Sequence, residues 1–434
     1  GVNHIFLHGS TYSPERAGWP GWKFYASVNF SPKNTIWKDA SALFGYVGNV
    51  QSVLQEGKAD NETLLYWPIY DQYNSYKKGN LFFQFKIHSL DEWLLDTPFY
   101  ETTNTLMNKG YGVDFLSDAF LKQAKVEAGK IVLPGGTYKA LVVPDCEFMP
   151  LASMEKLVAL KNAGASVIFT GLPESVPGYF EYEKQTAALE NLMSENDLAI
   201  TALESGLRAA EVAPETLVAS GLKFIRRAQG DSKIYYLVNH TQEDIDTYIP
   251  LSGNVDNAVL LDPLTRKVGA AAVRETEGQA EVKVQIASGD ALLIKTNWDS
   301  PEEQWAYTSP SAEGIPLETE WNISFEEGGP TLPEAATMNS LKSWTTLGED
   351  AEHFSGTASY TTTFTKPETA ADTWQLNLGD VRESAAVWLN DNYIGTAWSA
   401  PYRLDLGALQ AGENTLTIKV TNLAANRLRA KELR

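Results

Sequence analysis

Between residues 58 and 205, short apolar runs alternate with longer helical segments, and this alternation constrains the fold more than any other feature. The apolar runs, which have the length and continuity of strands buried on both faces, are 63–69, 113–117, 138–144 and 165–171. The helical segments, each of which ends at a glycine, are 91–110 and 149–164. The alternation predicts a parallel, doubly wound α/β domain of flavodoxin-like type.

The pattern changes after residue 205 to short strands separated by turn residues. Residues 206–299 predict a small antiparallel β-sandwich, and residues 300–434 predict a second all-β unit that closes as a jelly roll. Within the second unit, Asp391-Asn392 separates two apolar runs and predicts a tight hairpin turn. The expected fold class is therefore multidomain, α/β plus all-β.

The first 57 residues predict a different arrangement. Residues 1–10 alternate with period two and predict a buried strand with a polar tip, and 37–57 predict a helix that ends at Gly57. A strand, a long loop and a helix make one unit of a (β/α)8 barrel, and one unit cannot close a barrel. Because the chain begins with Gly inside an apolar run, we expect residues 1–57 to be the C-terminal piece of a catalytic barrel whose earlier part is missing.

Composition excludes several classes of function. The formal net charge of −20 argues against a nucleic acid or an anionic membrane as partner. No apolar run approaches the ~20 residues that span a bilayer, and neither GxGxxG nor GxxxxGK[ST] occurs, which argues against a bound nucleotide. The single cysteine, Cys146, is expected to be a buried, inert thiol. Twelve Trp and nineteen Tyr suit a saccharide partner, although most of them must be core residues.

Several stretches resemble the α-L-rhamnosidases of glycoside hydrolase family 106. They are HGSTYSP (8–14), WPGWKFYASVNF (19–30), YVGNVQSVLQEGK (46–58) and LYWPIYD (65–71). The α/β segment resembles the domain that follows the barrel in that family and in family 42 β-galactosidases. Residues 387–429 are similar to the galactose-binding-like, sugar-binding sandwich of family 2 glycosidases. The resemblance follows the family's order along nearly the whole chain.

The resemblance implies an inverting, calcium-dependent hydrolase that uses two carboxylates on an oligo- or polysaccharide with terminal α-L-rhamnose. Neither carboxylate can be assigned to a position here, and we expect both on barrel strands before residue 1. Calcium is implied by the resemblance only. No metal site can be assigned from the residues, because Asp244 and Asp246 lack the glycine-containing loop of an EF-hand. A periplasmic or extracellular location follows by analogy, and the oligomeric state stays open.

Two residues of the opening segment could act on a sugar through polar groups. Glu15 is the only carboxylate in the opening motif; it could serve as acid, base or calcium ligand, but a solvated loop charge is the favoured interpretation. His8 ends the predicted strand, where an imidazole can donate to one sugar hydroxyl and accept from another; a core histidine is equally consistent. His4 lies deeper in the strand and is interpreted as a core histidine.

Tyr12, Trp19 and Trp22 lie in the loop that would rise over the barrel mouth. They could stack on a sugar ring, or they could pack under the Pro20-Gly21 turn. In contrast, a set of polar and aromatic positions in the terminal sandwich is interpreted as structural: Trp388, Asn390, Gly395, Trp398, Asn414 and Asn422.

Two alternatives to a rhamnosidase remain. A β-galactosidase-type hydrolase is consistent with the shared α/β domain. A non-catalytic carbohydrate-binding module is consistent with the lack of an assignable carboxylate pair.

Overall fold

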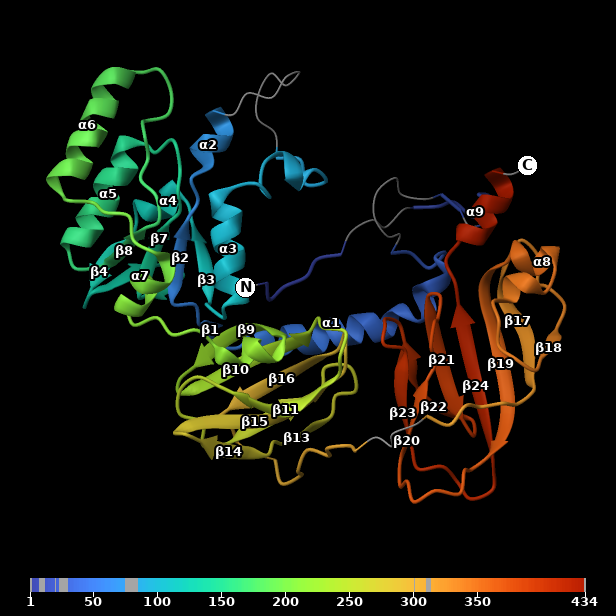
Figure 1. Ribbon diagram of the computed structural model, residues 1–434. Helices are drawn as coiled ribbons and strands as arrows, with labels where there is room; N and C mark the ends of the chain where they lie inside the picture. The colour runs from blue at the N-terminus through green and yellow to red at the C-terminus, as the bar shows by residue number, and fades with distance from the viewer. Residues whose placement is uncertain are drawn as a thin grey trace.

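The computed structural model describes residues 2–7, 12–19, 21–22, 30–74, 85–299, 301–309 and 314–432. Figure 1 shows an α/β unit, a β-sandwich below it, and a second β-sandwich to the right. The coarse prediction of a mixed α/β and all-β chain is confirmed.

The α/β unit is built on a four-stranded sheet with the order β3-β2-β7-β8, in which every neighbouring pair is parallel. The strands are β2 (Thr63–Tyr66), β3 (Val113–Leu116), β7 (Ala140–Val143) and β8 (Ser166–Phe169). The helices that pack around the sheet are α3 (Pro98–Asn108), α4 (Asp118–Leu121), α5 (Leu151–Asn162), α6 (Tyr182–Glu195) and α7 (Leu203–Ala209). The predicted parallel arrangement and its four strands are confirmed.

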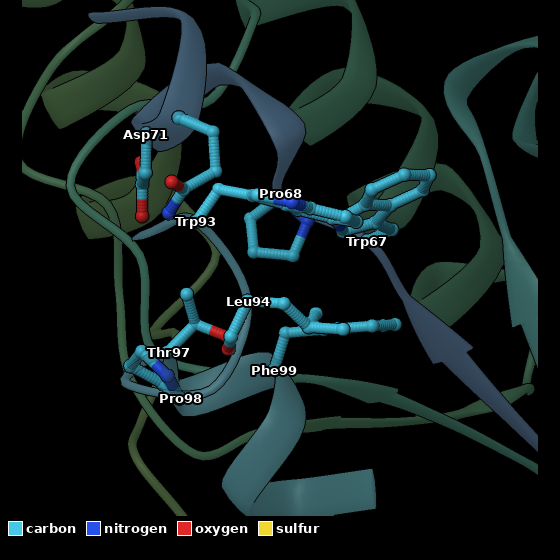
Figure 2. A pocket seen from close by; sticks show the side chains of 9 residues that line it. Trp67, Pro68, Asp71, Trp93, Leu94, Thr97, Pro98 and Phe99 are labelled. Carbon is cyan, nitrogen blue, oxygen red and sulfur yellow. The ribbon is translucent and has the colours of Figure 1, made fainter. Parts of the chain in front are cut away.

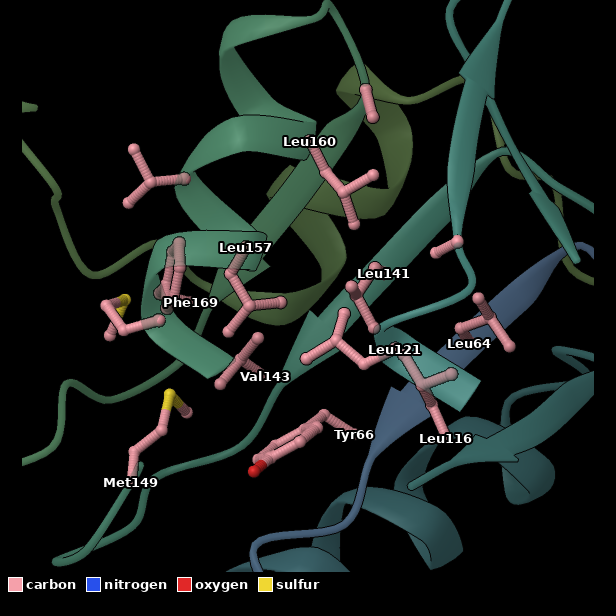
Figure 3. Packing of buried hydrophobic residues seen from close by; sticks show 14 of the residues in the cluster. Leu64, Tyr66, Leu116, Leu121, Leu141, Val143, Met149, Leu157, Leu160 and Phe169 are labelled. Atoms are coloured by element: carbon pink, nitrogen blue, oxygen red, sulfur yellow. The ribbon is translucent and has the colours of Figure 1, made fainter. Parts of the chain in front are cut away.

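Alternate residues of the central strands enter two different cores. Leu64 and Tyr66 of β2 pack with Leu157 of α5 on one face, as Figure 3 shows. Leu65, between them, packs with Leu106 of α3 on the other face. This two-sided burial explains the continuous apolar runs in the sequence.

Some elements of the α/β unit differ from the prediction. Helix α3 begins at Pro98 rather than at residue 91, because the Thr97 side chain accepts the backbone N–H of Tyr100 and caps it. Gly110 beyond its end has a φ of +88°, as expected of a glycine that stops a helix. The sequence pattern missed a small antiparallel sheet: β4 (Lys125–Glu127), β5 (Lys130–Leu133) and β6 (Gly136–Tyr138).

The middle sandwich consists of two antiparallel sheets with the orders β1-β9-β10-β16-β12-β13 and β11-β15-β14. The strands of the first sheet are β1 (Lys58–Ala59), β9 (Leu222–Gln229), β10 (Ser232–Asn239), β16 (Ala291–Thr296), β12 (Ala258–Leu261) and β13 (Val268–Ala270). Those of the second are β11 (Ile245–Pro250), β15 (Gln279–Ile286) and β14 (Val273–Thr276). Tyr235, Leu237, Val282 and Val284 lie in the core of the sandwich.

The terminal sandwich has a six-stranded sheet, β18-β17-β19-β24-β21-β22, and a two-stranded sheet, β20-β23. The strands are β17 (Trp321–Gly329), β18 (Ala336–Met338), β19 (Ser355–Thr365), β20 (Trp374–Asn377), β21 (Ser384–Leu389), β22 (Asn392–Ala397), β23 (Arg403–Gly407) and β24 (Glu413–Thr421). The hairpin turn between β21 and β22 is Asn390-Asp391, one residue earlier than predicted. Both residues have positive φ (+49° and +63°), as a type I′ turn requires. Helix α9 (Ala425–Glu432) follows the last strand.

Helix α1 (Ala40–Leu54) confirms the predicted helix and contacts both sandwiches (Figure 1). Val53 and Leu54 pack with Ile234 of β10, and the hydroxyls of Tyr46 and Tyr236 lie 2.7 Å apart. The short 3₁₀ helix η1 (Thr35–Lys38) precedes α1, and the two are joined by Asp39. The Asp39 Oδ2 accepts a hydrogen bond of 2.6 Å from Ser384 Oγ in the terminal sandwich.

The prediction of a buried strand at residues 1–10 is wrong for the residues that the structure describes. Val2–Leu7 form no strand, and Val2 and Phe6 are 69% and 87% exposed. The segment instead hydrogen-bonds to the end of α1, since Asn3 Nδ2 donates to the Leu54 carbonyl. His4 is exposed and stacks on Phe6, so it is not a core histidine. Alternation alone does not make a strand, because a strand also needs a neighbour that pairs with its backbone.

The burial of Asp290, which precedes β16, leads us to expect that the stability of the folded protein depends on pH. Burial, together with the nearby charge of Asp262, raises the pKa of Asp290 from 3.8 to about 6. Because the folded-state pKa lies above the unfolded one, the free energy of unfolding falls as the pH rises from about 4 through 6. Asp290→Asn is therefore expected to raise the melting temperature at pH 7, with a gain that shrinks towards pH 4.

Thermal melts of both proteins from pH 4 to pH 7 measure this effect. Asp372→Asn, at an exposed position of the terminal sandwich, is the control and should show no such pH-dependent gain. An equal melting temperature of wild type and Asp290→Asn at pH 7 would contradict the prediction.

Candidate functional site

Two described residues of the opening loop (residues 11–36), Trp22 and Lys33, meet at the side chain of Ser13. Ser13 Oγ accepts a hydrogen bond of 3.0 Å from the backbone N–H of Trp22 and lies 3.5 Å from Lys33 Nζ. Gly21, which precedes Trp22, has a φ of +82°, and a Cβ on it would lie 2.5 Å from Ser13 Oγ. Only glycine fits this turn, so Gly21 and Trp22 lie against Ser13.

The structure places the predicted aromatic residues of this loop in different surroundings. Tyr12 and Trp22 are 84% and 59% exposed, so both side chains are accessible to a ligand. Trp19 is half-buried, and its ring lies 3.2 Å from the position that a Cβ on Gly329 would take, which favours a packing role against the terminal sandwich. Glu15 is exposed, in keeping with a solvated loop charge. His8 lies outside the described residues.

A hollow lies at the carboxyl end of β2, where ligands of doubly wound sheets commonly bind (Figure 2). Its lining includes Trp67, Trp93, Thr97 and Phe99. The volume of the hollow is about 20 Å³, which admits about one water molecule and excludes a sugar ring. Trp67 and Phe99 stack with ring centroids 5.8 Å apart, so these aromatic side chains serve the packing of α3.

Asp71 borders the same hollow and fastens helix α2 (Ile69–Asn74) to the loop after β7. Its Oδ1 accepts the backbone N–H of Phe148 at 2.8 Å, and both oxygens lie 3.2 Å from the N–H of Glu147. Burial raises the pKa of Asp71, and these backbone donors partly offset the rise. Sequence reasoning did not single out Asp71, although the LYWPIYD stretch contained the signal. Because its oxygens are engaged by backbone donors, Asp71 positions the chain here.

The described residues offer no cluster of acidic side chains at which calcium could be placed. Across those ranges, no group of three or more His, Cys, Asp or Glu side chains could hold a metal ion. Asp244 accepts the N–H of Ser288, which lowers the pKa of Asp244, and it pairs with Arg403 at 2.9 Å. Asp246 pairs with Lys283. Both carboxylates therefore have protein partners.

The asparagines of the terminal sandwich hold backbone in place, as the sequence predicted. Asn390 Nδ2 donates to Asn414 Oδ1 at 2.9 Å, and Asn390 Oδ1 accepts the N–H of Thr415. Asn422 Oδ1 accepts the N–H of Gly356 at 2.8 Å. Cys146 is buried, and burial raises the pKa of its thiol, in keeping with an inert side chain.

No helix within the described ranges combines the length and the apolar character needed to cross a membrane.

Comparison with known proteins gives three findings. The model of glycoside hydrolase family 106, described as alpha-L-rhamnosidase, matches residues 88–271. The solved structure of a rhamnosidase from Novosphingobium sp. PP1Y superposes with a TM-score of 0.69 and 23% identity, covering 93% of this chain and 38% of that chain. A protein named putative beta-glucuronidase from Formosa agariphila is 40% identical over 119 residues, which are 26% of this chain and 10% of that protein.

The rhamnosidase structure and the family model contribute different kinds of information. The rhamnosidase structure establishes a shared fold over nearly the whole chain, and this chain spans about two fifths of its length. The family match covers the α/β unit from residue 88 and much of the middle sandwich. The resemblance to the α-L-rhamnosidases of glycoside hydrolase family 106 that the sequence predicted is therefore confirmed.

Proposed function

We propose that this chain forms part of a glycoside hydrolase that removes terminal α-L-rhamnose from glycans by inverting hydrolysis. The observation that carries the proposal is the family 106 match over residues 88–271. The fold shared with a rhamnosidase over 93% of the chain supports it. The proposed substrate is an oligo- or polysaccharide. The proposed location of the protein is the periplasm or the cell exterior, where such a glycan occurs.

Inverting hydrolysis needs a carboxylic acid that protonates the leaving oxygen and a carboxylate that activates water, separated by about 6.5–9.5 Å. We place this pair outside the chain, since the chain spans 38% of the rhamnosidase with the same fold. In this proposal the opening segment forms one wall of the sugar pocket. Tyr12 and Trp22 present exposed faces on which a pyranose can stack, and His8 would bond its hydroxyls.

The later units would brace this wall. Helix α1 follows the opening loop and η1, and it is fixed to the middle sandwich through Val53 and Leu54. Its N-terminal end is fixed to the terminal sandwich through Asp39 and Ser384. A loop anchored on two packed units can hold binding residues in a constant position.

A second candidate has support from one relative. The name of the Formosa agariphila protein, beta-glucuronidase, favours a hydrolase of acidic sugars, although the matched stretch is short. A β-galactosidase and a non-catalytic carbohydrate-binding module are further alternatives. A panel of p-nitrophenyl α-L-rhamnoside, β-D-glucuronide and β-D-galactoside distinguishes the three hydrolases when the chain is expressed with any further sequence that its gene encodes.

The 434-residue chain by itself is expected to be inactive on p-nitrophenyl α-L-rhamnoside, because we assign it no acid/base pair. The rate of p-nitrophenol release, measured at a high concentration of the 434-residue chain, should equal the rate without protein. Hydrolysis by this chain alone would contradict the placement of the carboxylates outside it.

The wall formed by the opening loop has its own test in the active, longer protein. Trp22→Ala and Tyr12→Ala should raise KM for the rhamnoside, while Tyr179→Ala, a fully exposed tyrosine of the α/β unit, serves as the control. Unchanged kinetics in both loop variants would remove this loop from the pocket. Glycan binding without turnover in that longer protein would favour the binding-module alternative.

A further inference from the structure

A second hollow, of about 340 Å³, lies between the start of α1 and the outer face of the terminal sandwich. This volume falls within the range of pockets that hold small organic ligands, about 300–1,000 Å³. Three residues of the α1 side line it: Lys38, Asp39 and Ser41. The remaining lining comes from strands β17, β21, β22 and β24.

The sandwich side of the hollow presents two aromatic rings. Trp388 of β21 is half-buried, and Tyr393 of β22 is 56% exposed, with their ring centroids 5.3 Å apart. The bulge between Val387 and Trp388 brings Trp388 opposite Tyr393 in the hairpin. Residues that alternate with Trp388 along β21, such as Val387 and Leu389, point into the core. Trp388 therefore belongs to the outer face and does not serve the core of the sandwich.

Polar groups surround the two rings. Tyr393 Oη and Thr396 Oγ1 lie 2.8 Å apart, and Ser41 adds a second hydroxyl to the lining. Asp39, 7% exposed, is held by Ser384 Oγ at the base of α1. Aromatic faces beside hydroxyl and carboxylate groups match a sugar, which presents C–H patches edged by hydroxyls.

The lining of the hollow carries as many basic as acidic side chains, Lys38 and Lys419 against Asp39 and Glu326. Lys419 Nζ pairs with Glu326 Oε2 at 2.8 Å, and Lys38 Nζ lies 3.8 Å from Glu327 Oε2. An anionic ligand would have to compete with these carboxylates for the two lysines, and Asp39 adds a further negative charge. The balance favours a neutral ligand over an acidic one.

We propose that this hollow binds one pyranose unit of a neutral saccharide, with Tyr393 and Trp388 as the stacking surface. The choice of a saccharide rests on the proposed function, whereas the hollow, its aromatic rings and its charge balance do not. The site would hold the glycan chain by a unit that need not be the one cleaved. Trp388, which the sequence analysis interpreted as structural, would then contact the ligand.

Calorimetric titration of the 434-residue chain with methyl α-L-rhamnopyranoside, methyl β-D-galactopyranoside and D-glucuronate tests the proposal without any need for turnover. At least one neutral glycoside should bind, and more tightly than glucuronate. Tyr393→Ala should weaken that binding about tenfold, the loss of one stacked ring. Tyr179→Ala is the matched control and should bind as the wild type does.

Trp388→Ala adds an independent measurement, with its melting temperature recorded to show that the sandwich remains folded. Neutral glycosides that bind equally well to wild type, Tyr393→Ala and Trp388→Ala would overturn the proposal, as would no binding by any neutral probe. Tighter binding of glucuronate would overturn the neutral assignment. A protein that binds through Tyr393 but whose longer form cleaves no rhamnoside would refute the proposed function and leave this site standing.

Discussion

Arg226→Ala is expected to lower the free energy of unfolding by about 3–5 kcal/mol, the range found when one partner of a buried ion pair is removed. Arg226 is 7% exposed and Glu215 is 1% exposed. Arg226 Nη1 donates to Glu215 Oε1 at 2.5 Å, and its Nη2 donates to the Asp60 carbonyl at 2.9 Å. Alanine would leave the Glu215 carboxylate buried without its cation.

The contacts of Arg226 join segments that are distant in sequence. Its Nε lies 2.7 Å from Asp60 Oδ2, and the two groups form an ion pair. Their relative orientation does not make a hydrogen bond. Burial lowers the pKa of Arg226, but the charges of Asp60 and Glu215 outweigh it and raise the pKa above its ordinary value. Glu215 also accepts the hydroxyl of Tyr235 at 2.9 Å. The guanidinium thus links Asp60, which lies just before β2, to Glu215 and through it to Tyr235 of the middle sandwich.

Urea unfolding and calorimetry of the variant measure the loss. Arg226→Lys should recover only part of it, because one ammonium cannot reproduce the planar fork that reaches Asp60 and Glu215 together. Lys184→Ala removes the exposed pair with Glu181 and is the control, with a change below about 1 kcal/mol. A similar small change in Arg226→Ala would contradict the assignment of this residue as a buried anchor.

Phe354→Ala is expected to destabilise the terminal sandwich by about 3–5 kcal/mol, as is typical of a buried phenylalanine. Phe354 is fully buried, and its ring centroid lies 5.0 Å from that of Phe325 and 5.8 Å from that of Trp344. The ring also lies against Gly328 and Gly356, where added Cβ atoms would come within 2.9 Å and 2.8 Å of Phe354 Cζ. Alanine would leave a cavity beside two paired glycines that cannot fill it.

Differential scanning calorimetry should show the transition of the terminal sandwich at a lower temperature. Phe180→Ala removes a phenylalanine that is 79% exposed and provides the control. The transition of the α/β unit should keep its temperature, because Phe354 belongs to the buried cluster of the terminal sandwich. An unshifted melting profile for Phe354→Ala would contradict the packing described here.

Much of the architecture follows from local patterns in the sequence. Continuous apolar runs such as the one around Leu65 predicted parallel strands, because a strand covered by helices on both faces has no polar side. Glycines at helix ends, such as Gly110 and Gly164, located the boundaries well because both have positive φ. The hairpin turn was misplaced by one residue because Asn390, Asp391 and Asn392 are all compatible with positive φ.

Some features that the sequence did not predict depend on contacts between distant segments. Period-two alternation over Val2–Leu7 predicted a buried strand, yet this segment is exposed and hydrogen-bonds to α1. The hollow at Trp388 needs Asp39 and Ser384, which are 345 residues apart in sequence. No local sequence pattern indicates that these two residues form a hydrogen bond. The exposure of Tyr12 and Trp22, and the packing of Trp19, likewise depend on the folded environment.

The position of α1 has a consequence for synthesis of the protein. The helix leaves the ribosome roughly 180 residues before β10, the strand on which Val53 and Leu54 pack. At about 5–20 residues per second, it waits roughly 10–35 s for that partner. A 15-residue helix is marginal by itself in water. The α/β unit, whose strands are all made in the interval, can therefore complete its own core while the apolar face of α1 remains open to chaperones.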